Sequence, residues 1–181
     1  LTGENYRGPV TLRFDFNVLH IPEKIKLVAE EPEKYNILIN SQAIKTAETD
    51  EYYTDKSFKV LDISGYVKEG LNIIEATRYF EPMEKASSIL TSLFQSLSGV
   101  ELESMYLIGD FGVFGTTEPT DTNSIRFGKQ FRIGKELSET GGEITTKGYP
   151  FYTGSVILSK TINLETVPDN KKSILSIESF N

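Results

Sequence analysis

Hydrophobic and polar residues alternate along the first part of the chain, which is the pattern of half-buried β-strands. The clearest example has apolar side chains at every second position, at Val10, Leu12, Phe14, Phe16 and Val18. Shorter runs predict further strands over 24–29, 35–39, 58–63 and 71–79. Asn40-Ser41 predicts a tight turn after the third of these strands.

The second half of the chain is less regular. Residues 100–114 are rich in apolar side chains and glycine, 116–122 read as a polar loop, and 125–133 predict a short hairpin or a kinked strand. Residues 135–147 are polar and predict a long surface loop or meander. Two last strands are expected over 156–164 and 173–179. Only 83–97 has apolar residues at helical spacing, so one short helix is expected there.

Many short strands separated by turn residues, without alternating helices, predict an all-β fold. We expect a jelly-roll β-sandwich in residues 1–116 and a polar segment with a potential hairpin in 117–147. Residues 148–181 then supply further strands, which either complete the sandwich or open a truncated second module.

Composition narrows the classes of function. The 181 residues carry a formal net charge of −7 and no cluster of Lys and Arg, so nucleic acid is not an expected partner. No stretch approaches the ~20 apolar residues that span a bilayer. The absence of cysteine excludes disulfides and thiolate chemistry from the sequence. The hydrophobic fraction of 38% favours a folded domain over a disordered chain.

Three stretches resemble a known family. Residues 35–40, YNILIN, resemble the strand and turn of galactose-binding-like jelly rolls, with Ser41 in place of the usual glycine. Residues 62–74, DISGYVKEGLNII, resemble a signature of the sugar-binding sandwich domain of family 2 glycoside hydrolases. Residues 106–113 and 148–154, YLIGDFGV and GYPFYTG, look like the non-catalytic sandwich regions of large bacterial α-L-rhamnosidase-like enzymes. The resemblance covers most of residues 9–164.

This resemblance implies a non-catalytic accessory or carbohydrate-binding-type module of a larger bacterial glycoside hydrolase. Such a module shapes the substrate cleft or contacts glycan weakly, and its other partners are domains of the parent enzyme. The implied location is secreted, periplasmic or on the cell surface. Two alternatives stay open: a carbohydrate-binding module with its own affinity, and a structural or adhesion domain without glycan affinity. The isolated chain is not expected to be catalytic, because the family's hydrolytic carboxylates lie on a separate barrel domain.

Two aromatic clusters are candidates for glycan contact, because sugar C–H faces stack on rings while hydroxyls need polar partners. The first is the loop with Asp50, Tyr52 and Tyr53. The second contains Tyr149 and Tyr152 in GYPFYTGSV, where Phe151 is expected in the core because Pro150 favours an extended chain before a strand. The alternative for both clusters is ordinary packing at the rim of a sandwich.

Other chemistry is weakly indicated. Asp110 lies between two short glycine-containing runs and is the most suggestive carboxylate, although turn hydrogen bonding is its ordinary role. His20 is the single histidine, so no His-based metal site or triad is expected. The resemblance admits a structural calcium ion, but no EF-hand spacing is present. Its candidate oxygen ligands are Asp50, Glu51, Asp55, Asp121 and Asp169.

Overall fold

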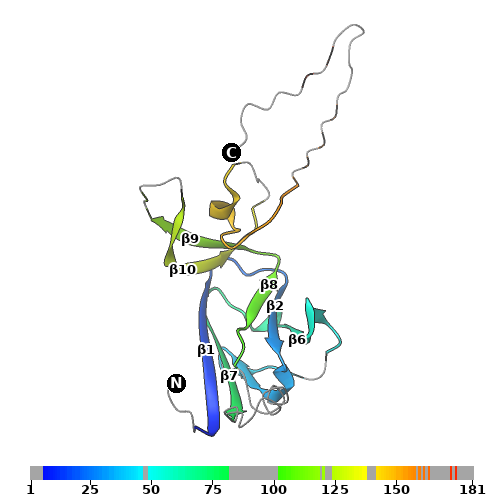
Figure 1. Ribbon diagram of the computed structural model, residues 1–181, viewed down its shortest axis with the longest axis vertical. Coiled ribbons are helices and arrows are strands. Elements are labelled where there is room, and N and C mark those ends of the chain that lie inside the picture. Colours follow the sequence, from blue (N-terminus) through cyan, green and yellow to red (C-terminus); the bar gives the residue numbers. More distant parts are fainter. Residues whose placement is uncertain are drawn as a thin grey trace, which may run out of the picture.

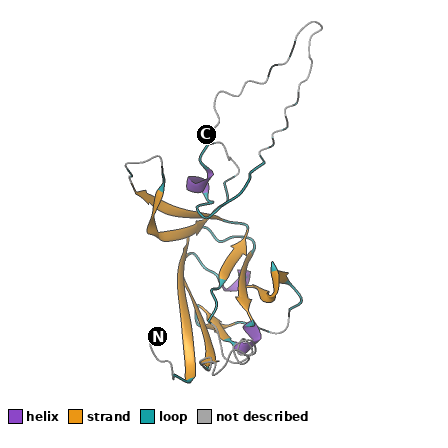
Figure 2. Cartoon of the chain, in the orientation of Figure 1, coloured by secondary structure: helices purple, strands orange, loops and turns teal. Residues whose placement is uncertain are grey.

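In the computed structural model the described part of the chain folds into two β-sheets (Figures 1 and 2). The structure describes residues 6–46, 49–81, 102–118, 120, 124–137, 142–157, 159, 161, 163, 172 and 174. The first sheet has the strand order β4-β3-β7-β1-β10-β9 and the second has the order β5-β6-β2-β8. The expected all-β sandwich is therefore confirmed.

The strands of the first sheet are β1 (Gly8–Val18), β3 (Asn36–Ile39), β4 (Gln42–Ala43), β7 (Gly70–Phe80), β9 (Gly112–Glu118) and β10 (Arg126–Gly134). Those of the second are β2 (Ile25–Glu30), β5 (Tyr52–Tyr53), β6 (Asp55–Asp62) and β8 (Tyr106–Gly109). The helical segments in the described residues are the short 3-10 helices η1 (Pro32–Lys34), η2 (Ser64–Tyr66) and η4 (Ile144–Lys147).

The long antiparallel pair of β1 and β7 forms the centre of the first sheet. Its register runs from Gly8 opposite Phe80 to Val18 opposite Gly70. Successive side chains of a strand point to opposite sides of the sheet, so the alternation in the sequence places apolar side chains on one face and polar side chains on the other. Cross-strand polar pairs occupy the outer face: the hydroxyls of Thr11 and Thr77 lie 2.8 Å apart.

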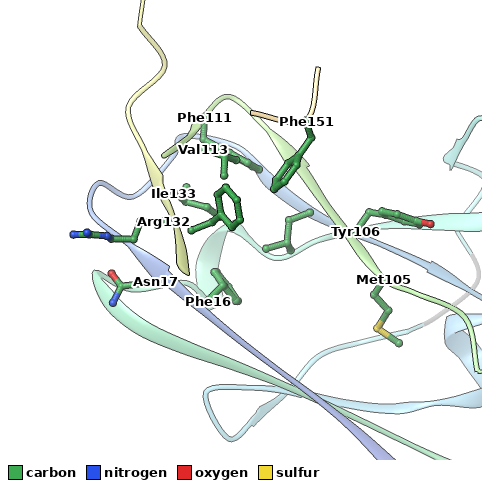
Figure 3. A pocket seen from close by; sticks show the side chains of 11 residues that line it. Phe16, Asn17, Met105, Tyr106, Phe111, Val113, Arg132, Ile133 and Phe151 are labelled. Atoms are coloured by element: carbon green, nitrogen blue, oxygen red, sulfur yellow. The ribbon is translucent and has the colours of Figure 1, made fainter. Parts of the chain in front are cut away.

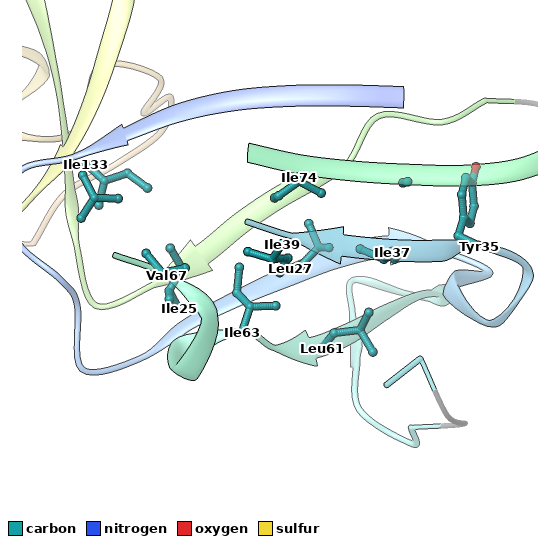
Figure 4. Close-up of a cluster of buried hydrophobic side chains, with 12 residues drawn as sticks. Ile25, Leu27, Tyr35, Ile37, Ile39, Leu61, Ile63, Val67, Ile74 and Ile133 are labelled. Atoms are coloured by element: carbon teal, nitrogen blue, oxygen red, sulfur yellow. The ribbon is translucent and has the colours of Figure 1, made fainter. Parts of the chain in front are cut away.

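Aliphatic side chains from both sheets form the core (Figure 4). The most deeply buried are Ile25, Leu27, Ile37, Ile39 and Ile63. Each such burial contributes roughly 1.5–3 kcal/mol relative to an exposed side chain. Ile25, Leu27, Ile37 and Ile39 lie on strands predicted from the sequence, whereas Ile63 follows the end of β6.

The stretch 62–74 that carries the family resemblance has a structural role. The Asp62 carboxylate accepts hydrogen bonds from the Ser64 backbone N–H at 2.9 Å and from the Ser64 hydroxyl at 2.7 Å. The Ser64 hydroxyl oxygen in turn accepts from the backbone N–H of Ile25 at 3.1 Å. Asn72 is fully buried and bonds the backbone of Lys68 and Gly70. These residues fix the crossing from the second sheet into β7.

Two expectations for the C-terminal region are wrong, and a third stays a prediction. Val156 and Ile157 belong to no strand and are 46% and 94% exposed, and the described residues 159, 161 and 163 are also not in strands. The strand expected over 173–179 falls outside the described residues except for Ile174, so it stays a prediction. Phe151 is 68% exposed and is not a core residue. Apolar alternation makes a strand only where a sheet edge is available for pairing.

The expected segment boundaries differ from the observed elements. Strand β9 crosses residue 116, and β10 lies within the polar segment 117–147 and pairs with β9 as a hairpin. The pairing register of β10 with β9 shifts between Phe127 and Phe131, so 126–134 form one irregular strand and not a hairpin of their own. The predicted helix over 83–97 lies outside the described residues.

Candidate functional site

Strand β10 joins the sandwich through a short parallel contact with the end of β1. The paired residues are Asn17 with Arg132 and Val18 with Ile133, and the Leu19 backbone N–H donates to the Ile133 carbonyl at 2.8 Å. Beyond this contact the β9–β10 ribbon extends past the end of β1 (Figure 1). The departure of β10 from β1 leaves a hollow on each side of the sheet.

The outer hollow is a groove of about 680 Å³, which we call the junction groove. Its lining residues come from β1, β7, β10 and the residue after β1: Asp15, Phe16, Asn17, Leu19, Leu71, Lys129, Gln130, Phe131 and Arg132. Polar side chains with planar amide, carboxylate or guanidinium groups thus lie beside apolar ones. All but one of these residues stand on strands, so the sheet fixes their positions.

Charges in the junction groove are only partly balanced. Asp15 lines it, and its Oδ1 lies 3.3 Å from Nε of Arg13, which also reaches Glu75 at 3.2 Å. Lys129 and Arg132 are exposed. Within the described residues neither of these two cations takes part in an ion pair.

The inner hollow is apolar and measures about 340 Å³. Phe16, Ile133 and Phe131 form part of its wall, and Phe151 closes it from the C-terminal segment. The rings of Phe131 and Phe151 are 4.8 Å apart between centroids. Figure 3 shows Asn17 and Arg132 pointing away from this hollow, in keeping with strand alternation. Asn17 and Arg132 border both hollows, but the other lining residues of the inner hollow are apolar or aromatic, so it mainly offers packing surface.

The loop candidates Tyr52 and Tyr53 lie on β5, at one edge of the second sheet. Both rings are about half exposed, at 49% and 50%. Asp50 beside them is exposed, and the neighbouring Glu51 is held by Lys26, whose Nζ lies 2.5 Å from its Oε1. The inner hollow lies against β8 at the opposite edge of the same sheet. The structure therefore does not bring the loop tyrosines to the junction.

The hydroxyls of Tyr149 and Tyr152 both have partners. Tyr149 donates to Oε1 of Glu136 at 2.6 Å, and Tyr152 donates to the Ser155 carbonyl at 2.5 Å. The hydrogen bond to the Glu136 carboxylate, together with partial burial, raises the pKa of Tyr149 above its usual value. Val113 anchors the start of this segment, because its backbone N–H donates to the Gly148 carbonyl at 2.8 Å. These bonds give both tyrosines local structural roles.

No cation-binding cluster of three or more Asp, Glu or His residues occurs among the described residues. The Asp55 carboxylate accepts from the backbone N–H and the hydroxyl of Ser57, each at 2.8 Å, and these bonds lower its pKa. Asp121 and Asp169 lie outside the described residues. The calcium expectation stays a prediction.

The side chains of Asp110 and His20 are exposed. The Asp110 backbone N–H donates to the Lys24 carbonyl at 3.1 Å, which ties the end of β8 to the start of β2. No helical segment in the described residues has the length or apolar character needed to cross a bilayer.

Comparison with protein-family models, with curated proteins and with solved structures finds no match in any of the three.

Sequence reasoning did not identify the junction groove. Its residues lie near positions 15–19, 71 and 129–132, and only the parallel pairing of β10 with β1 places them together. The one available signal was the cluster of polar outward positions at the end of the first strand, Asp15 and Asn17.

Proposed function

We propose that the chain is a non-catalytic β-sandwich module that contacts carbohydrate through the junction groove. The observation that carries this proposal is the composition of the groove. Asn17, Gln130 and Arg132 supply hydrogen-bonding groups for hydroxyls, and Leu71 with Phe131 supplies apolar surface for C–H faces. Saccharides present both kinds of surface in alternation, so a site for them needs both.

The size and the setting of the groove support the same proposal. Its volume of about 680 Å³ falls within the ~300–1,000 Å³ typical of small-molecule sites. Side chains on strands are held more firmly than side chains on loops, which lowers the entropy lost on binding.

The family resemblance of residues 35–40 and 62–74 supports an accessory role within a larger glycoside hydrolase. In this proposal the parent protein is secreted, periplasmic or displayed on a bacterial surface, and the module shapes or extends its substrate cleft. The jelly-roll, galactose-binding-like assignment belongs to the same proposal.

A second candidate function is that of a structural or adhesion module that contacts other protein domains and no glycan. Phe151 beside the apolar inner hollow is 68% exposed, and Ile157 is 94% exposed. Such apolar side chains would be buried by a neighbouring domain.

A glycan array probed with the labelled chain tests the first candidate, followed by calorimetric titration of the best ligand. We expect Asn17→Ala and Gln130→Ala each to weaken binding about tenfold, which corresponds to the loss of one hydrogen bond of about 1.4 kcal/mol. Tyr52→Ala and Tyr53→Ala are the matched variants for the alternative surface and should leave affinity unchanged.

If only the tyrosine variants lose affinity, the site is on β5 and the groove assignment is wrong. If no glycan binds, the structural candidate is favoured. Hydrolysis of aryl glycosides by the purified chain would overturn the non-catalytic part of the proposal.

A further inference from the structure

Cationic residues are concentrated on β10 and at the position directly after it, although the whole chain has a formal net charge of −7. Arg126, Lys129, Arg132 and Lys135 recur at every third position, and residues 126–135 contain no acidic side chain. A basic segment in an acidic protein creates a local positive potential that the net charge does not reveal.

The cations of β10 differ in their surroundings. Arg126 pairs in register with Glu118 on β9, which places a carboxylate beside it and away from the junction groove. Lys129 and Arg132 line the groove and have no ion pair within the described residues. The one carboxylate among the lining residues is Asp15, and Arg13 lies 3.3 Å from it. The groove therefore has an excess of positive charge.

We propose that the junction groove selects an anionic saccharide, whose carboxylate or sulfate is bound by Arg132 and Lys129. This inference rests on the proposed function and adds the ligand's charge. Arg132 offers a planar fork of N–H donors that matches a carboxylate or a sulfate edge, and Lys129 adds a point charge. Asn17 and Gln130 are then available for the hydroxyls of the same sugar unit.

Asp15 also contributes to selectivity. Arg13 lies between the carboxylates of Asp15 and Glu75, so this group keeps one net negative charge at the β1 side of the groove and repels an anion there. The β10 side attracts an anion through Lys129 and Arg132. A saccharide with one acidic group per unit would therefore bind with that group toward β10 and its hydroxyls toward β1.

Calorimetric titration of the full chain tests this inference with three probes of equal length. These are an oligosaccharide of galacturonic acid, its methyl ester and a sulfated galactose oligosaccharide. We expect at least one anionic probe to bind about tenfold or more tightly than the methyl ester at low salt. The advantage should shrink as salt rises, because screening weakens charge pairing. Comparison of the two anionic probes shows whether carboxylate or sulfate is preferred.

The variant Arg132→Gln, alone and with Lys129→Gln, should reduce the affinity of the anionic probe to that of the ester. Arg126→Gln is the matched control on the same strand, and this variant should still bind the anionic probe more tightly than the methyl ester. Thermal unfolding of each variant confirms that it is folded.

Equal binding of the ester and of both anionic probes, with sensitivity to Asn17→Ala, overturns the charge preference and leaves the proposed function standing. If the double variant still prefers the anionic probe, the proposal is also overturned, because residues other than Arg132 and Lys129 then bind the anionic group. Failure of these probes and of every glycan on the array overturns both proposals.

Discussion

Asn40 donates a hydrogen bond from its side-chain amide to Oδ1 of Asn72 at 2.8 Å. The same amide also donates to the Tyr66 carbonyl at 2.9 Å, and its Oδ1 accepts from the Ile73 backbone N–H at 3.1 Å. The pair thus joins the turn after β3, the segment after η2 and the start of β7. A fully paired polar network inside a core is stabilising as long as every member is present.

Replacement of Asn72 by alanine should destabilise the protein by about 3 kcal/mol, because the Lys68 N–H and carbonyl would lose their buried partner. Urea unfolding measures this change. Asn36→Ala is a matched control, since Asn36 is exposed on β3 and should change stability by no more than about 0.5 kcal/mol. A loss below about 1 kcal/mol for Asn72→Ala would contradict the role of the network.

Ser41→Gly should stabilise the protein by about 0.5–1 kcal/mol. Asn40 and Ser41 form the two-residue turn between β3 and β4, with φ of 50° and 67°. Such turns favour glycine, because an L side chain is strained at positive φ. Ser41→Ala keeps the strain and should give no gain, so a comparison of thermal midpoints for the two variants isolates the backbone effect.

Gly109→Ala should cost more than about 2 kcal/mol, because the backbone of the neighbouring strand would have to move. An added Cβ would lie 2.1 Å from the Lys24 carbonyl oxygen, which accepts from Asp110. Gly65→Ala is the matched control, with nothing within 4 Å of its Cβ position. Chemical denaturation of both variants checks this contrast. Similar stabilities for the two would show that β8 can shift away from β2 at little cost.

Stability should fall in acid partly through Asp62. Hydrogen bonds from the backbone N–H and then the hydroxyl of Ser64 lower the pKa of this carboxyl below its ordinary 3.8. Because the folded-state pKa is lowered, the stabilisation is complete above the ordinary pKa and is lost as pH falls through the folded-state pKa.

The variant Asp62→Asn keeps an oxygen acceptor but cannot titrate. The difference in urea midpoint between parent and variant should therefore shrink as the pH is lowered from neutrality to below the ordinary pKa. The pKa values of Asp55 and Glu143 are lowered in a similar way. Both residues are present in parent and variant, so their pH-dependent contributions cancel in the difference between the two urea midpoints. A difference that does not change with pH would contradict the assignment.

Strands were readable from the sequence where one face is buried along the whole strand. Leu12, Phe14 and Phe16 of β1 and Ile74 and Ala76 of β7 pack in or against the core. The continuous apolar run at Val156 and Ile157 lacks that alternation, and these two residues are not in a strand. The sequence pattern shows which side chains a strand would bury. Whether a neighbouring strand is available for pairing depends on the tertiary fold, which the local pattern does not show.

The motifs that suggested the family turned out to be structural in this fold. Asp62, Ser64 and Asn72 form turns and a buried network, so a sequence that keeps them preserves the sandwich without specifying a ligand. The junction groove could not be predicted, because a parallel contact between segments more than 100 positions apart creates it. Local patterns contain no information about that pairing.

The most direct test of the carbohydrate proposal is the mapping of amide chemical shifts while the best array ligand is titrated into isotopically labelled protein. We predict that the shifts cluster at Asn17, Leu71 and residues 129–132, around the junction groove. Shifts confined to Tyr52 and Tyr53, or no shifts at all, would contradict the account.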